Sequence, residues 1–395
     1  MSGDGVLVIG AGAAALGVVE GLREQGYQEP IDVVGAEKWS PYDRPPLSKR
    51  VLDGRLTPEQ TELRPSADLG RLGARWLLGH RVVGLDVDAH AAELDDGKRL
   101  RWSSAVVATG LAPRLPGFAR GLDGVHVLRT LDDALVLRTE MLNARGIAVV
   151  GAGVLGCEIA ATARGMGLEV ALIDKEPAPM WSRTGHELAA MLATLHTRRG
   201  AKLHTGVGVA RLEGDGGRVR EVVLADGTRI DADLVVVALG SDTATDWLQG
   251  SGLTVDDGVV CDAHCRAAPD VYAAGDVARW YHEGLGRLVR REDRTNASAQ
   301  GLAVARRILG DTRPYAPMAS SWTNQYDVSL HFAGELVGEN PEDTALTVVS
   351  GNPGEGKFAA TVAAGEHVIG AVGWNDPRGF RAARAAIGRP SSTAA

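Results

Sequence analysis

Gly10-Ala11-Gly12-Ala13-Ala14-Ala15 and Gly151-Ala152-Gly153-Val154-Leu155-Gly156 are the two stretches that decide the fold. Each follows a short apolar run, Val6 to Ile9 in the first case and Ile147 to Val150 in the second, and each opens a segment with helical periodicity. A strand, a glycine-rich turn and a helix in this order are typical of a dinucleotide-binding unit. Either motif alone could be only a tight turn, but the pair predicts two dinucleotides and electron transfer between them.

The residue types in both motifs suit a bound pyrophosphate. The first glycine, Gly10 or Gly151, allows the strand to turn sharply, and the second, Gly12 or Gly153, allows the backbone to approach the phosphates. The third position must be small so that helix and strand pack closely, and it is alanine in one motif and glycine in the other. The helix N-terminus then offers free N–H groups and partial positive charge to the phosphates.

An acidic residue follows each motif at the offset expected for a ribose-binding carboxylate. Glu37 lies 22 residues after Ala15, and Asp174 lies 18 residues after Gly156, each near the end of an apolar run. A carboxylate at this place binds the ribose hydroxyls and repels a 2′-phosphate, so Asp174 favours NADH over NADPH. Lys175 follows directly and weakens that preference. Either carboxylate could instead be a solvated strand end.

The rest of the chain suggests how these units are joined. Two similar runs, Ser104 to Gly110 and Leu234 to Gly240, close the first and the second unit, and the chain then returns to Val271–Asp276. We therefore predict an α/β protein with two Rossmann-like domains, one formed by residues 1–111 and 241–313 and interrupted by the other, residues 112–240. Short strands and a final helix from about Arg378 predict a C-terminal α+β domain over residues 314–395.

Composition narrows the function classes. The net charge of −8 argues against nucleic-acid binding, and no apolar run approaches the length of a membrane-spanning helix. The first strand starts by Val6 and leaves no room for a signal peptide, so we expect a cytoplasmic protein, as a monomer or weak dimer. Arg378, Arg381 and Arg384 recur at helical spacing, either as a dock for an acidic protein or as ordinary surface.

The cysteines argue against metal and disulfide chemistry. The chain has three, Cys157, Cys261 and Cys265, with no C-x-x-C pair and none in the first 156 residues. Their spacing does not suit zinc or an iron–sulfur cluster, so no metal is expected. Cys157 lies inside the second motif's helix, where we expect it to pack as a small apolar residue.

Four further segments carry a specific resemblance. They are Pro41-Tyr42-Asp43-Arg44-Pro45-Pro46-Leu47-Ser48-Lys49, Leu128-Arg129-Thr130-Leu131-Asp132-Asp133-Ala134, the Ala-Ala-Gly-Asp segment ending at Asp276, and Trp322-Thr323-Asn324-Gln325-Tyr326-Asp327. In order and spacing they resemble the oxygenase-coupled ferredoxin reductases, the family of putidaredoxin reductase and of the reductases that serve Rieske dioxygenases. The resemblance covers nearly the whole chain. It implies FAD at the first motif, NADH at the second and a C-terminal interface domain.

The resemblance also implies which residues meet each cofactor. Those expected to contact FAD are Gly10, Gly12, Ala14, Ala15, Glu37, Arg44, Lys49, Val82, Thr109, Gly110, Arg129, Gly275, Asp276 and Arg294. Those expected to contact NADH are Gly151, Gly153, Gly156, Glu158, Asp174 and Gly240. The family often has tryptophan where this chain has Arg294, and a cation there could alter the flavin potential or the choice of partner.

Three residues are expected to take part in the redox chemistry. Lys49 matches the lysine beside the flavin ring, where a positive charge stabilises the reduced flavin. Glu158 matches a glutamate near that lysine and the nicotinamide, and Trp322 matches an aromatic residue that shields the site from water. Lys49 could instead be a surface lysine and Trp322 a core residue of the C-terminal domain.

The resemblance implies an FAD-dependent ferredoxin–NAD(+) reductase. Such an enzyme takes hydride from NADH and passes single electrons to an acidic ferredoxin, expected to be of the 2Fe–2S type, which supplies a cytochrome P450 or a Rieske oxygenase. Two alternatives stay open. One is an NADH oxidase or disulfide reductase, which the missing early cysteines disfavour, and the other is a flavoprotein with a binding or signalling role.

Overall fold

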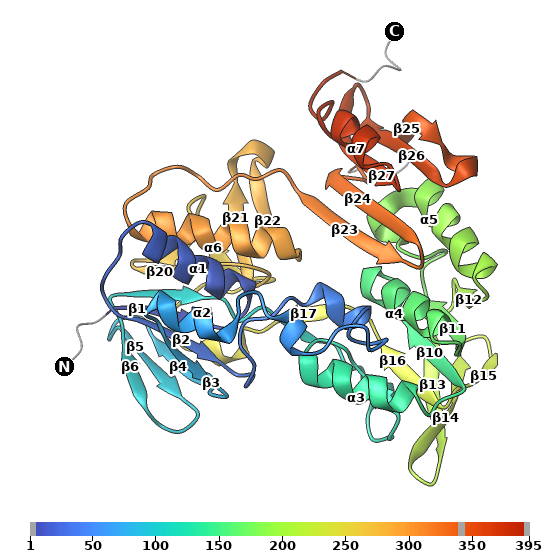
Figure 1. The fold of residues 1–395 in the computed structure, drawn as a ribbon, viewed down its shortest axis with the longest axis horizontal. Coiled ribbons are helices and arrows are strands. Elements are labelled where there is room, and N and C mark those ends of the chain that lie inside the picture. Colours follow the sequence, from blue (N-terminus) through green and yellow to red (C-terminus); the bar gives the residue numbers. More distant parts are fainter. Residues whose placement is uncertain (1–4, 339–343, 391–395) are drawn as a thin grey trace. The chain divides into compact units, whose positions relative to one another are not determined.

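The computed structural model describes residues 5–338 and 344–390 and divides into two compact units (Figure 1). The first unit consists of Met1–Arg44, Pro58–Ala112 and Ser241–Pro317. The second unit consists of Pro45–Thr57, Pro113–Gly240 and Met318–Ala395. The chain thus passes between the units several times, and the short segment that contains Lys49 belongs to the second unit.

A largely parallel sheet forms the centre of the first unit. Its strand order is β19-β20-β7-β1-β2-β3, with only the β19–β20 pair antiparallel. Its strands are β1 (Val6–Ile9), β2 (Ile31–Gly35), β3 (Arg75–Leu78), β7 (Ser104–Val107), β19 (Arg266–Ala268) and β20 (Val271–Ala273). Every residue of β1 is buried, as expected for a parallel strand that is covered on both faces.

Two helices of the first unit pack unusually closely. Figure 1 shows α1 (Ala13–Glu24) beside α6 (Arg294–Ile308), and small residues line their contact. A Cβ atom added at Gly17 would lie 2.7 Å from the Ser298 carbonyl oxygen, and one added at Gly301 would lie 2.2 Å from the Ala14 carbonyl oxygen. Glycine at these positions therefore lets the helix backbones approach each other directly.

The remaining elements of the first unit are short. A three-strand antiparallel meander follows the order β4-β5-β6, and another small sheet has the order β18-β21-β22. Their bounds, with that of a short helix, are β4 (Val82–Asp86), β5 (Ala91–Leu94), β6 (Arg99–Arg101), β18 (Val259–Cys261), β21 (Ala278–His282), β22 (Arg287–Arg290) and α2 (Ser66–Leu69). β8 (Leu111–Pro113) and β17 (Ser241–Thr243) pair where the chain leaves and re-enters this unit.

The second unit contains another parallel sheet, with the order β12-β11-β10-β16-β9. Its strands are β9 (Val125–His126), β10 (Gly146–Val150), β11 (Glu169–Asp174), β12 (Lys202–Thr205) and β16 (Leu234–Val237). Its helices are α3 (Leu131–Met141), α4 (Val154–Gly165) and α5 (Trp181–Arg198). A small antiparallel sheet consists of β13 (Val209–Asp215), β14 (Arg218–Leu224) and β15 (Arg229–Asp231).

The C-terminal part of the second unit is an antiparallel sheet with one helix. The sheet follows the order β23-β24-β27-β26-β25, and α7 (Pro377–Arg384) buries Phe380 and Ala383 in the apolar cluster beside it. Its strands are β23 (Ser320–Gln325), β24 (Val328–Gly334), β25 (Thr344–Asn352), β26 (Lys357–Ala364) and β27 (His367–Trp374). The predicted fold class is confirmed, since each of two parallel sheets has a strand, β1 or β10, that leads through a glycine-rich turn into a helix, and an α+β part completes the chain.

Candidate functional site: two glycine-rich turns and a buried ion pair

The first glycine-rich turn has the geometry of a phosphate cradle. Gly10 has φ of +114°, and a Cβ atom there would lie 2.1 Å from the Ala108 carbonyl oxygen, so only glycine fits. A Cβ atom at Gly12 would meet nothing within 4 Å, which leaves open space in front of the α1 N-terminus. Ala15 is fully buried under the turn. The residues present therefore fit a dinucleotide pyrophosphate.

The second turn repeats this geometry in the other unit. Gly151 has φ of +108°, and its Cβ atom would lie 2.2 Å from the Ala238 carbonyl oxygen. Gly153 again faces open space, with nothing within 4 Å of an added Cβ atom. Gly156 has less space around it than Ala15, the equivalent residue of the first turn, because an added Cβ atom would lie 1.8 Å from the Gly151 carbonyl oxygen. This turn also fits a pyrophosphate, now at the N-terminus of α4.

The two predicted ribose carboxylates are held in different ways. Asp174, at the end of β11, accepts hydrogen bonds from the backbone N–H groups of Ala152 (2.5 Å) and Glu176 (2.9 Å). Glu37 instead accepts from the Arg44 guanidinium (2.7 Å) and the Tyr42 hydroxyl (2.5 Å). Asp174 is thus tied to the turn itself, whereas Glu37 is tied to side chains of the following segment.

Arg44 is influenced by two other predicted FAD-binding residues of the first unit. Burial opposes its ionisation, but the charges of Tyr42, Glu37 and Asp276 together hold the pKa of Arg44 above its usual value. Glu37 is thus paired with this cation, and the charge of Asp276 acts on it as well. Gly275 lies next to the first turn, since its Cβ atom would be 3.1 Å from that of Ala14.

Arg294, which stands where the family often has tryptophan, forms an ion pair within the first unit. Its guanidinium donates to the Asp43 carboxylate (2.6 Å) and to the Ser298 hydroxyl (2.6 Å). Asp293 caps the same helix by accepting from the backbone N–H of Asn296. The cation is thus balanced by a carboxylate from the Pro41–Lys49 segment.

Lys49 and Glu158 form a largely buried ion pair in the second unit. The Lys49 ammonium lies 2.6 Å from the Glu158 Oε2 atom, and the two side chains are 18% and 7% exposed. The Ser48 hydroxyl donates to the same oxygen (2.6 Å), and the Thr323 hydroxyl donates to Oε1 (2.7 Å). Thr162 on α4 also donates to the Ser48 backbone carbonyl (2.7 Å). Both oxygens of this carboxylate are therefore fixed, as a buried charge requires.

Other predicted residues lie apart from these clusters. Trp322 is partly buried on β23, next to Thr323, and Val82 is buried at the start of the β4-β5-β6 meander. Arg129 lies just before α3, where its backbone N–H donates to Asp133 (3.0 Å). Three other predicted residues lie in the connections that follow strands β7 and β16: Thr109, Gly110 and Gly240. The Thr109 hydroxyl donates a hydrogen bond to the Ala244 carbonyl oxygen (2.8 Å). The cofactor roles of all these residues remain predictions.

Ser48 and Thr323 are contacts that sequence reasoning missed. Both stand inside segments quoted for the resemblance, but neither was assigned a role. A usable signal was present on β23, since Thr323 and Gln325 are two apart and so share one face of the strand. Two polar residues on a buried strand face need partners, which marks them as candidates for a network.

The thiols are inert in this structure. Cys157, Cys261 and Cys265 are unpaired and buried. Burial raises the pKa of Cys157 and of Cys261 well above the usual value, and it raises the pKa of Cys265 to about 12. A thiolate nucleophile is therefore disfavoured at each of them.

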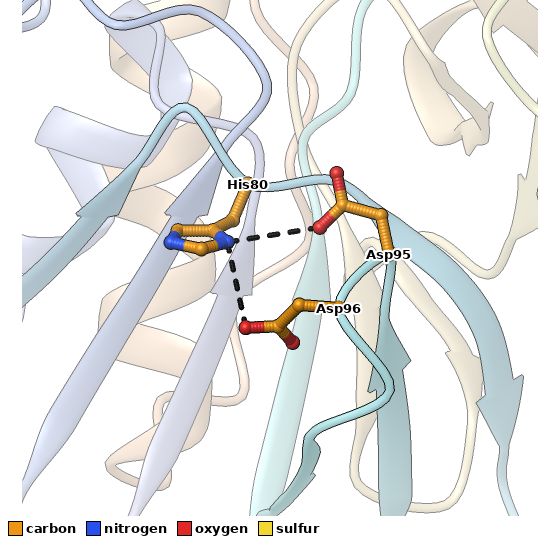
Figure 2. A group of neighbouring side chains, drawn as sticks. All are labelled: His80, Asp95 and Asp96. Carbon is orange, nitrogen blue, oxygen red and sulfur yellow. Dashed lines mark ion pairs between the residues drawn. The ribbon is translucent and has the colours of Figure 1, made fainter.

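One group of side chains in the described residues has the composition of a metal site. His80 Nδ1 lies 3.6 Å from Asp95 Oδ1 and 3.9 Å from Asp96 Oδ2 (Figure 2). Asp95 and Asp96 are exposed, and Asp96 also accepts from the Lys98 ammonium (2.7 Å). A neighbouring lysine is a poor companion for a cation, so this group gives no reason to revise the expectation of no metal.

Within residues 5–338 and 344–390, no helix is both long and apolar enough to cross a bilayer.

The two turns define a protein that fits two dinucleotides, and comparison with known proteins identifies its family. The profile of the pyridine nucleotide-disulphide oxidoreductases matches residues 4–301, and that of the reductase C-terminal domain matches residues 320–395. The chain belongs to this oxidoreductase family.

Individual relatives and structures agree with this assignment. The chain is 35% identical to the "anthranilate 1,2-dioxygenase system ferredoxin–NAD(+) reductase component" of Burkholderia cepacia, over 98% of this chain and 95% of that protein. It is 32% identical to the "rhodocoxin reductase" of Rhodococcus erythropolis, over 96% and 88%. The crystal structure of the covalent putidaredoxin reductase–putidaredoxin complex superposes with a TM-score of 0.92 at 30% identity, covering 98% of this chain and 93% of that one. The predicted resemblance to ferredoxin reductases is confirmed.

Proposed function

We propose that this protein is an NADH-dependent, FAD-containing ferredoxin reductase that supplies a cytochrome P450 or a Rieske oxygenase. The observation that carries the proposal is the pair of glycine-rich turns in one chain, each with open space for a pyrophosphate at Gly12 or Gly153. The relatives named as ferredoxin–NAD(+) reductases align over almost the whole chain. Its cofactors are FAD and NADH, and its partner is a ferredoxin.

The overall reaction is NADH + 2 oxidised ferredoxin → NAD⁺ + H⁺ + 2 reduced ferredoxin. FAD, when bound, supplies the change from two-electron to one-electron transfer. We assign FAD to residues 1–111 and 241–313, where Gly12, Glu37, Arg44 and Asp276 lie. We assign NADH to residues 112–240, and the interface domain to residues 314–395.

Within this proposal the protein supplies an oriented dipole and keeps water away from the reaction. Lys49 places a cation whose charge Glu158 balances at 2.6 Å, so the pair presents a fixed dipole without a net charge. Trp322, partly buried on the strand that also carries Thr323, is assigned the role of a shield against water. Asp174 is assigned to the NADH ribose, where its two backbone hydrogen bonds fix its orientation.

The partner and the location complete the proposal. α7 exposes Arg378, Arg381 and Arg384 while burying Phe380, which suits contact with an acidic 2Fe–2S ferredoxin. A cytoplasmic location is supported by the three unpaired cysteines, since disulfides are rare in reducing compartments.

A coupled assay tests the function. The flavin-loaded enzyme is mixed with NADH and candidate ferredoxins, and cytochrome c reduction is followed. We expect rapid reduction only when a ferredoxin is present. Ferredoxin-independent turnover of peroxide or a disulfide would support the disulfide-reductase alternative, and slow, partner-independent NADH oxidation would support the signalling flavoprotein.

A matched pair of variants ties the assay to the second turn. Gly153→Ala places a methyl group in the open space before α4 and should raise KM for NADH, since it occupies the pyrophosphate position. Gly165→Ala, at the other end of the same helix, also meets nothing within 4 Å and should leave KM unchanged.

A further inference from the structure

A buried polar chain runs away from Glu158 inside the second unit. β23 contributes Thr323 and Gln325, and α5 contributes His196, all three with no measurable exposure. Burying this many polar groups is costly unless each one finds a partner. The ion pair of Lys49 and Glu158 does not by itself require His196 or Gln325.

The distances join these residues into one line. Thr323 Oγ1 lies 2.7 Å from Glu158 Oε1, and Gln325 Nε2 lies 3.4 Å from Thr323 Oγ1. Gln325 Oε1 lies 3.0 Å from His196 Nε2, and His196 Nδ1 lies 3.1 Å from the Tyr326 hydroxyl. Gln325 Nε2 also lies 3.4 Å from the Met180 sulfur, a weak acceptor.

The chemistry of the groups fixes the direction of every hydrogen bond. An ionised carboxylate only accepts, so Thr323 must donate to Glu158, and its oxygen is then free to accept from the Gln325 amide N–H. The Gln325 carbonyl therefore faces His196 and requires a proton on Nε2. The remaining ring nitrogen, Nδ1, then carries a lone pair and accepts from Tyr326.

This arrangement needs a neutral imidazole. Burial lowers the pKa of His196 to about 4, so the ring is uncharged at neutral pH. The chain thus holds a single tautomer of His196 at one end and a single orientation of the Thr323 hydroxyl at the other.

We propose that Thr323, oriented by Gln325 and His196, is a positioning residue that holds the Glu158 carboxylate against Lys49. Oε2 of Glu158 is held by Ser48 and Lys49, whereas Oε1 accepts, from the part of the chain that the structure describes, a hydrogen bond from Thr323. Without the Thr323 hydroxyl the carboxylate loses the contact that stops it turning about its own axis. The effect on electron transfer rests on the proposed function, but the hydrogen-bond chain is a property of this polypeptide alone.

The first test is a double-mutant cycle on the flavin-loaded enzyme. Thr323→Val keeps the shape and removes the hydroxyl, and it should slow flavin reduction by NADH about tenfold in stopped flow, with FAD content unchanged. Thr323→Ser restores the hydroxyl and should recover most of the rate. In a Glu158→Gln background, Thr323→Val should have less than a twofold further effect, because the two residues act as a unit.

The second test does not depend on activity. ¹⁵N NMR of the imidazole nitrogens, with the His196 signals assigned by their loss in His196→Gln, should show a protonated Nε2 and an unprotonated Nδ1. Tyr326→Phe removes only the far end of the chain and should shift the Nδ1 resonance while leaving FAD content unchanged.

The outcomes separate this proposal from the proposed function. Additive effects of Thr323→Val and Glu158→Gln, or no recovery in Thr323→Ser, would overturn the positioning role, and so would an Nδ1-protonated His196. If NADH reduced the wild-type flavoenzyme but the enzyme then reduced no ferredoxin, the proposed function would be refuted. The double-mutant cycle on flavin reduction would still be valid. If Thr323→Val does not fold, the Tyr326→Phe shift and the tautomer decide the question.

Discussion

The two glycine-rich turns share one backbone geometry but differ in what surrounds them. Gly10 and Gly151 have φ values of +114° and +108°, and each lies against a carbonyl oxygen that leaves no room for a side chain. Gly12 and Gly153 both face open space. These common features are what a pyrophosphate demands, so they are the same in both units.

The differences begin at the third position of the motif. The first turn accommodates a buried Ala15, whereas at Gly156 any Cβ atom would lie 1.8 Å from the Gly151 carbonyl oxygen. The carboxylates differ as well. Glu37 is balanced by the guanidinium of Arg44, but Asp174 is held by peptide N–H groups. The comparison teaches that the turn favours the class of ligand, whereas its neighbours determine how the charge of the following carboxylate is balanced.

Gly156→Ala should have the largest effect of the substitutions that compare the two turns. The equivalent position in the first turn is naturally alanine, but here the new methyl group forces α4 away from the turn, at an expected cost of at least ~3 kcal/mol in unfolding free energy. Urea unfolding and NADH titration would measure this. Gly165→Ala in the same helix is the control and should be neutral or stabilising by up to about 1 kcal/mol. Equal stability of the two variants would contradict the close approach of α4 to its turn.

Acid should weaken the second unit through His196. Its pKa is about 6.5 when unfolded and about 4 when folded, so between these values the unfolded chain binds the extra proton. Stability contributed by the neutral ring is therefore present above pH 6.5 and lost as pH falls towards 4, by about 2 kcal/mol at pH 5. Denaturant unfolding of the wild type and of His196→Gln across this range should show the difference. If the unfolding free energy of the wild type changed with pH as steeply as that of His196→Gln, His196 would be excluded as the cause of the acid destabilisation.

The two carboxylates can be compared directly by removing their charges. Asp174→Asn should weaken NADH binding about tenfold and reduce the preference over NADPH, because repulsion of the 2′-phosphate is lost. Glu37→Gln leaves NADH affinity unchanged on our assignment and should instead lower FAD retention after dialysis. Nucleotide titrations and flavin absorbance on the same two variants measure both effects. An NADPH preference in the wild type would refute the role given to Asp174.

The sequence predicted the turns well because their requirements are local. A positive φ and a blocked Cβ position select glycine at Gly10 and Gly151 whatever the rest of the chain does. The final helix was expected from about Arg378 and begins at Pro377, because Asp376 caps it and proline suits the first helical position. Local rules therefore located the start of this helix to within about one residue.

The contacts that complete the site could not be predicted in the same way. Thr323 reaches Glu158 across 165 residues, and Arg294 reaches Asp43 across 251 residues. Spacing in the sequence carries no information about such pairs, because they depend on how whole elements pack. Arg294 was expected to place a cation near the flavin, and only the structure shows that Asp43 balances it.

Changes at the Arg294–Asp43 pair should have the smallest effect on stability. They test directly what Arg294 does at the position where the family often has tryptophan. Both side chains are partly exposed, at 25% and 33%, so Arg294→Met should cost no more than about 1 kcal/mol of stability. If Asp43 balances the cation, Asp43→Asn should shift the flavin midpoint potential upwards, because it leaves Arg294 uncompensated, whereas the double variant should return close to the wild-type value. Spectroelectrochemical titration of the four proteins measures this cycle. Identical potentials in all four would show that Arg294 acts on the fold of the first unit and not on its flavin.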